Sequence, residues 1–194
     1  MAKLKETPSQ TAGPFVHIGT LPEFAGLRNA APTQSNVLTR DGTSGQRIRI
    51  EGLVHDGAGA LVKDAMLEIW QANANGQYGS NDFTGWGRAA TDFETGLYTF
   101  QTIKPGRTVF HDGRTQAPHI SVSIFARGIN VHLQTRLYFS DEAAANAADP
   151  VLQLVGRPDL VATLIAKMEM RDGRPLYHFD IRLQGDQETV FFDF

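Results

Sequence analysis

The chain has 194 residues, a formal net charge of −3 and no cysteine. A slightly acidic chain gives no electrostatic reason to expect a nucleic acid or an anionic membrane as a partner, and the lack of cysteine excludes disulfides, thiolate metal ligands and a cysteine nucleophile. Since the sequence shows neither a signal-peptide core nor an apolar run long enough to span a bilayer, we expect a soluble, cytoplasmic protein.

One domain is expected over residues 1–194, because a β-sandwich of this length commonly forms a single unit. Residues 1–47 carry little periodic structure and are predicted to be a long N-terminal arm with loops. Residues 7–15 consist of small residues and turn formers that end at Phe15, and small residues let a backbone approach a ligand or partner closely. Two interpretations stay open here: a disordered tail, or an arm that packs over another surface.

Residues 48–194 have the pattern of a sandwich core, in which short runs with a side-chain period of two recur between turn dipeptides. The predicted strands cover residues 48–55, 65–72, 97–103, a strand that begins at 119, 131–139 and 176–183. Two short helices are predicted at 141–148, ending at Asp149-Pro150, and at 158–164, with Pro158 first. Many short, evenly spaced strands predict an all-β fold, a β-sandwich of two mixed or antiparallel sheets.

The strand that begins at His119 has the most informative pattern. Its odd-numbered residues His119, Ser121 and Ser123 share one face, because side chains alternate across a strand. A histidine at a strand start after a long loop suits a metal or substrate site, since the loop aims it and the sheet holds it rigid. Imidazole metal sites need three or four ligands, however, and the six histidines show no His-x-His or His-x-x-x-His spacing. Each histidine alone is better explained as a structural or surface residue.

Several separated segments resemble the intradiol ring-cleavage dioxygenases, in the same order along the chain. They are Thr7–Phe15, Leu67–Tyr78, Gly87–Asp92, Thr102–Gly106, Ala117–Ile120, Ala126–Asn130, Arg136–Phe139 and Phe179–Gly185. Within that family the chain resembles the α chains of hetero-oligomers built from related α and β chains. The resemblance implies an enzyme that oxidises 3,4-dihydroxybenzoate with O₂ to 3-carboxy-cis,cis-muconate.

The resemblance also implies a metal site whose ligands this chain has partly lost. Iron-bearing members bind Fe(III) with two tyrosines and two histidines, and the matching positions here are Tyr78, Thr108, His119 and Ser121. Fe(III) favours anionic phenolate oxygen, whereas threonine and serine hydroxyls stay protonated. We therefore expect no metal and no catalytic residue in this chain alone, with Fe(III) bound by the partner β chain.

A substrate pocket shared by the two chains is a further implication of the resemblance. The residues that this chain would contribute are Thr11, Ala12, Gly13, Pro14, Phe15 and Arg127. A guanidinium at position 127 can attract an aromatic carboxylate or pair with a carboxylate of the partner. The alternative is an ordinary solvated arginine at the end of a strand.

Two other functions stay open. In the first, the chain is itself an iron dioxygenase that uses other ligands, such as His111 or His132. In the second, it is a non-enzymatic β-sandwich binding module, since a fold never fixes function by itself.

Overall fold

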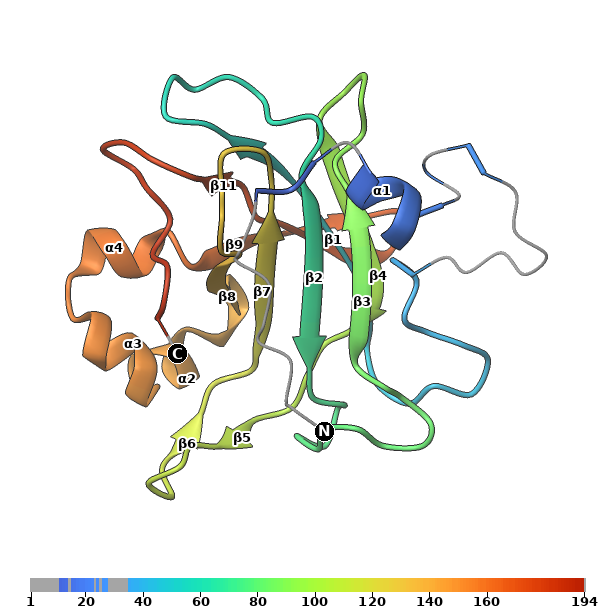
Figure 1. Ribbon diagram of the computed structural model, residues 1–194. Coiled ribbons are helices and arrows are strands. Elements are labelled where there is room, and N and C mark those ends of the chain that lie inside the picture. Colours follow the sequence, from blue (N-terminus) through green and yellow to red (C-terminus); the bar gives the residue numbers. More distant parts are fainter. Residues whose placement is uncertain (1–10, 14, 23, 25, 28–34, 194) are drawn as a thin grey trace, which may run out of the picture.

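The computed structural model describes residues 11–13, 15–22, 24, 26–27 and 35–193, and in this part of the chain strands predominate (Figure 1). The strands are β1 (Arg47–His55), β2 (Met66–Gln71), β3 (Trp86–Ala90), β4 (Leu97–Ile103), β5 (Thr108–Val109), β6 (Thr115–Gln116), β7 (His119–Phe125), β8 (Leu133–Phe139), β9 (Ile165–Arg171), β10 (Arg174–His178) and β11 (Ile181–Arg182). The helices are α1 (Phe15–Thr20), the 3₁₀ helix η1 (Ser140–Glu142), α2 (Ala143–Ala147), α3 (Pro150–Val155) and α4 (Pro158–Ala162). No described helix is long and apolar enough to cross a membrane.

Nine of the described strands form one mixed sheet that folds into two layers, and β5 and β6 form a separate two-stranded sheet. Hydrogen bonds connect β11, β1, β10, β9, β8, β7, β2 and β3 in that order, and β4 pairs with β1 off this path. The link between β8 and β9 is parallel and has two residue pairs in register. Side chains from both halves of the path, such as Ile50 and Phe100 from one and Leu67 and Ile120 from the other, share one core cluster. The all-β sandwich prediction is confirmed, with the difference that its layers are continuous.

Alternation in the sequence explains how the strands build this core. On β7, the even-numbered residues Ile120, Val122 and Ile124 are buried in the core cluster, as the side-chain period of two predicts. Burying each such aliphatic side chain stabilises the fold by roughly 1.5–3 kcal/mol. The opposite face of β7 is therefore left to His119 and Ser121.

Two of the strand predictions need correction. The run 176–183 is divided between β10 and β11, and the carboxylate of Asp180, which lies in the gap, accepts a hydrogen bond from the backbone N–H of Leu53 at 2.9 Å. The run 131–139 begins only at Leu133, and the side chain of Val131 is exposed. Strands β3, β5, β6 and β9 were not predicted. Strand β3 is rich in glycine and alanine, β5 and β6 have two residues each, and β9 exposes most of its residues.

The helix predictions also need correction. Residues 140–162 hold η1 and three short α-helices, where two helices were predicted. Asp149-Pro150, interpreted from sequence as a helix stop, is the start of α3: the Asp149 carboxylate caps the helix, and proline needs no hydrogen-bond partner at the first position. The predicted extended arm contains α1, which begins after Gly13, whose carbonyl accepts from the N–H of Val16 at 3.1 Å.

Candidate functional site

Strand β7 connects the two regions that the sequence predicts to be functional. His119 is its first residue, and Arg127 follows its last residue, Phe125, by two positions. We use "His119 pocket" for the side chains of Tyr78, Thr108, His119, Ser121 and Arg136. We use "arm groove" for the hollow lined by Ala12, Gly13, Asp64, Phe93 and Arg127, among others.

His119 is held as a neutral imidazole in the His119 pocket. Its side chain is buried, and Nδ1 lies 2.8 Å from the carbonyl oxygen of Ala117. Burial, together with the positive charge of Arg136, lowers the pKa of His119 to about 4. The imidazole is therefore uncharged at neutral pH and is fixed in orientation by the backbone.

Tyr78 lies beside Thr108 because of a tight turn at Gly76. Gly76 has φ +77°, and a Cβ there would lie 1.9 Å from the carbonyl oxygen of Arg107, so only glycine fits. The ring of Tyr78 stacks on Trp70 with centroids 5.8 Å apart. Burial raises the pKa of Tyr78, although the charge of Arg136 and a hydrogen bond with Thr108 oppose the rise. Tyr78 is thus a neutral phenol at neutral pH.

The other two predicted positions complete the pocket without supplying a metal ligand. Thr108 is buried, and its Oγ1 accepts a hydrogen bond from Gln116 Nε2 at 3.1 Å. The side-chain oxygen Oε1 of Gln116 accepts a hydrogen bond from Arg136 Nη1 at 2.7 Å. Ser121 on β7 is in register with Arg136 on β8. The structure therefore brings the four predicted positions together around a guanidinium.

The donors of the His119 pocket do not fit Fe(III). Two of them, Thr108 and Ser121, are alcohols, and the guanidinium of Arg136 places a positive charge among them. Among the described residues, no group of three or more His, Cys, Asp or Glu side chains could hold a metal ion.

Sequence reasoning missed Arg136 and Gln116. Arg136 stands in the segment Arg136–Phe139 that carries part of the resemblance, but its face becomes known only once β8 is aligned with β7. The sequence offers the alternation of both strands as a signal, and the register between them supplies the rest.

The arm groove, at the other end of β7, is lined by three of the six residues predicted to form the substrate pocket. It has a volume of about 910 Å³, and Ala12, Gly13 and Arg127 line it together. The hydroxyl of Thr11 accepts a hydrogen bond from the backbone N–H of Gly128 at 2.8 Å, although the two residues are 117 positions apart. Pro14 and the side chain of Phe15 lie outside the described residues.

Arg127 keeps most of its guanidinium available in the arm groove. It forms an ion pair with Asp64, yet its side chain is 73% exposed. Such exposed pairs contribute only about 0–1 kcal/mol, so Arg127 can exchange partners at little cost. Phe93, which lines the same groove, is 55% exposed and packs against Phe24 with ring centroids 4.8 Å apart. The buried Nε2 of His17, in contact with both phenylalanines, finds no hydrogen-bond partner among the described residues.

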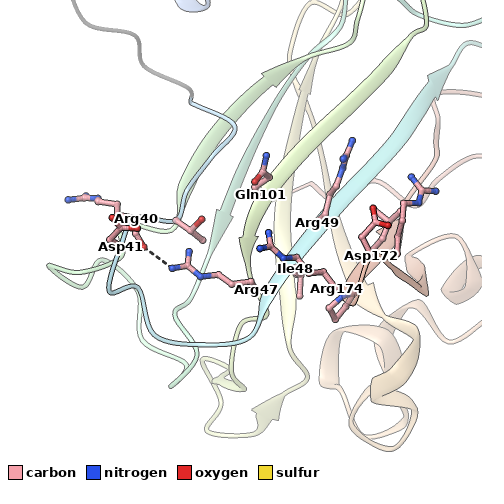
Figure 2. Close-up of a pocket in the computed structure, with 12 residues that line it drawn as sticks. Arg40, Asp41, Arg47, Ile48, Arg49, Gln101, Asp172 and Arg174 are labelled. Carbon is pink, nitrogen blue, oxygen red and sulfur yellow. Dashed lines mark hydrogen bonds between the residues drawn. The ribbon is translucent and has the colours of Figure 1, made fainter.

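A third hollow, the arginine groove, lies on the outer side of β1 and β10 and has a volume of about 690 Å³ (Figure 2). Arg47, Arg49 and Arg174 line it. Part of this charge is engaged within the chain, since Arg49 pairs with Glu51 at 3.2 Å and Arg47 donates to the carbonyl of Arg40 at 2.7 Å. The groove can attract anions, but none of the residues predicted from the sequence to form a site lines it.

Known proteins are similar to this chain over most of its length. A family model described as Dioxygenase matches residues 20–185. A protein from Pseudomonas putida named protocatechuate 3,4-dioxygenase alpha chain is 52% identical, and the match covers 98% of each chain. The chain belongs to the intradiol ring-cleavage dioxygenase family. A beta chain of protocatechuate 3,4-dioxygenase from Burkholderia cepacia is also similar to this intradiol dioxygenase chain, with 35% identity over 75% of it and 67% of the relative.

A solved relative supports the fold. The structure of hydroxyquinol 1,2-dioxygenase from Pseudomonas putida DLL-E4 matches with a TM-score of 0.61 and 21% identity, over 82% of this chain and 64% of that one. Intradiol dioxygenases use iron, whereas the two alcohols and the guanidinium of the His119 pocket do not fit this metal.

Proposed function

We propose that this chain is the α subunit of a protocatechuate 3,4-dioxygenase and that its partner is an iron-bearing β chain. The assembly cleaves protocatechuate (3,4-dihydroxybenzoate) with O₂ between the two hydroxylated carbons and forms 3-carboxy-cis,cis-muconate. The proposal is supported by the α-chain relative, which matches over nearly the full length, and by the similarity to a β chain of the same enzyme.

One observation carries the proposal: the two ends of β7 differ in metal-ligand chemistry and in the exposure of their side chains. The His119 pocket has lost the ligands that Fe(III) needs, whereas the arm groove exposes Arg127 and Phe93. Exposed arginine and aromatic side chains are typical of residues that become buried in an interface. A chain that cannot hold the metal but displays such a groove is best explained as the half of a shared site that shapes the substrate pocket.

Each residue of the shared pocket then has a physical role. The small residues Ala12 and Gly13 let the arm approach the substrate closely, and the resemblance assigns Pro14 and Phe15 to the same pocket. Arg127 attracts the carboxylate of protocatechuate or pairs with a carboxylate of the β chain. Closure of the wall excludes water from the reacting centre. The iron of the β chain supplies the Lewis-acid chemistry.

Purification of the chain with and without a β chain tests the proposal. Phenolate-bound Fe(III) is coloured, so we expect the chain alone to be colourless, free of iron and inactive in oxygen uptake with protocatechuate. The co-purified pair should contain iron and consume oxygen. Iron and oxygen uptake in the chain alone would contradict the proposal and favour a self-sufficient dioxygenase.

The two alternative functions find less support. His111 and His132, the ligands considered for a self-sufficient enzyme, are both exposed, and neither belongs to a metal-binding group among the described residues. A non-enzymatic binding module predicts a stable monomer whose residues 1–20 are equally sensitive to protease with or without the β chain. Protection of that segment by the β chain supports the shared pocket. The cytoplasmic location stays a prediction.

A further inference from the structure

Arg136 lies at the centre of the His119 pocket. The register of β7 and β8 places it directly opposite Ser121, and the register of β2 and β7 places Trp70 on the other side of Ser121. Directly opposed side chains of an antiparallel sheet emerge on the same face. The guanidinium therefore lies among the positions that would have to surround a metal ion.

Hydrogen bonds fix the guanidinium in this place. Arg136 Nη1 donates to Gln116 Oε1 at 2.7 Å, and Gln116 Nε2 donates in turn to the hydroxyl of Thr108 at 3.1 Å. The same Nη1 lies 3.4 Å from the hydroxyl of Tyr138, which donates to the buried carboxylate of Asp149 at 3.2 Å. The positive charge is thus tied to one former ligand position and to the cap of α3.

The charge of Arg136 also reaches the two ligand positions that the chain retains. The ring of His119 lies 5.7 Å from that of Tyr138, whose hydroxyl is 3.4 Å from Arg136 Nη1. The ring of Tyr78 stacks on Trp70, which flanks Ser121 on the side opposite Arg136. A metal ion placed between Tyr78 and His119 would meet a positive charge at short range in a partly buried setting, where repulsion is only weakly screened. The guanidinium cannot relieve this repulsion by losing its proton.

We propose that Arg136 is a resident cation that takes the place of the metal and keeps metal ions out of the His119 pocket. Replacing Thr108 and Ser121 by the missing tyrosine and histidine is then insufficient to restore a metal site, because the guanidinium must be removed as well. The inference rests on the proposed function only in treating Tyr78, Thr108, His119 and Ser121 as former ligand positions.

Metal analysis of four variants, each co-purified with the β chain, tests this inference. The first carries Thr108→Tyr and Ser121→His, and the others add Arg136→Gln, Arg136→Lys or Arg174→Gln to these two changes. The Lys variant keeps the charge, and Arg174 is a matched control from the arginine groove, outside the pocket. Iron per αβ pair is compared with the wild-type pair prepared in parallel, and the absorption of phenolate-bound Fe(III) provides a second readout.

We expect only the Arg136→Gln variant to gain iron, about one additional ion per chain. Uptake by the variant that retains Arg136, or equal uptake by the Lys and Gln variants, would overturn the inference, because charge would not be the barrier. If the Gln variant does not assemble, Arg136→Met replaces it, and no uptake with either neutral residue also overturns the inference. Failure of the proposed function is distinguishable, since it would appear as iron in the wild-type chain purified without the β chain.

Discussion

Polar side chains are buried and hydrogen-bonded within the chain at the start of β7, whereas those beyond its end are exposed. At its start, His119 is buried, bonded to a backbone carbonyl and surrounded by the network of Arg136 and Gln116. Beyond its end, Arg127 is mostly exposed and held by a single carboxylate, that of Asp64. One end is closed by contacts within the chain, and the other is open.

This difference shows which end of β7 depends on contacts within the chain. In the His119 pocket, Thr108, Gln116 and Arg136 are linked by hydrogen bonds, although the side chain of Tyr78 is 42% exposed, so these linked groups contribute to stability. The arm groove keeps groups that a partner or substrate can engage. Changes at the His119 end should therefore lower stability, and changes at the Arg127 end should lower activity.

The largest effect is expected for Asp149→Ala at the closed end. The buried Asp149 carboxylate accepts hydrogen bonds from the N–H groups of Ala117, Val151 and Leu152 and from the hydroxyl of Tyr138. Leaving these donors unpaired should lower the free energy of unfolding by roughly 3–4 kcal/mol, as measured by urea unfolding of the αβ pair.

Asp159→Ala provides the control for this change. Asp159 also lies beside a helix start, but it is exposed and pairs with Arg157. The Asp159→Ala substitution should leave the urea unfolding midpoint nearly unchanged. An equal loss in both variants would contradict the view that the network around Asp149 stabilises the closed end.

The pH dependence of stability should report on His119. Its pKa in the fold is about 4, below the ordinary value near 6.5, so the unfolded chain takes up the proton first as the pH falls. The contribution of His119 should lower stability between about pH 6.5 and pH 4, by on the order of 3 kcal/mol, and this contribution levels off below pH 4. Urea unfolding across this range measures the loss.

His119→Asn should flatten the profile in that window, because the residue that titrates there is gone. His132→Asn, which changes an exposed histidine, serves as the control and should leave the profile as in the wild type. A wild-type profile that is flat from pH 7 to pH 4 would show that His119 is not held neutral by its surroundings.

A smaller effect, on activity alone, is expected for Arg127→Gln at the open end. If Arg127 attracts the substrate carboxylate, kcat/KM for protocatechuate should fall about tenfold or more, mainly through KM, with little change in stability. Catechol, which lacks the carboxylate, should show a smaller loss. Arg174→Gln removes an arginine elsewhere and should behave as the wild type. Equal losses with both substrates would indicate pairing with the β chain instead.

The sequence predicts the β-sandwich well because burial follows alternation. Ile120, Val122 and Ile124 could be placed in the core from their spacing alone. Strand β9 could not be found in this way, because most of its residues are exposed and its pairing with β10 depends on the rest of the fold. The start of α3 was missed because Asp149-Pro150 signals both the end of one helix and the beginning of another.

The candidate site was predictable only where a local segment carries it. Tyr78 and His119 follow recognisable turns and loops, and both lie within reach of the charge of Arg136. Arg136 and Gln116 reach the pocket from separate strands, and the proximity of Thr11 to Gly128 depends on the path of the arm. Such contacts depend on strand register and on the path of the chain, which alternation in the sequence alone does not supply.

Oxygen uptake by the αβ pair that carries Tyr78→Phe tests most directly whether the His119 pocket takes part in iron binding. Tyr78 is the only tyrosine of the His119 pocket, and its hydroxyl would be indispensable if iron were bound there. We predict that iron content and oxygen uptake stay at the wild-type level. A loss of about tenfold or more in either would show that the His119 pocket still works as a metal site.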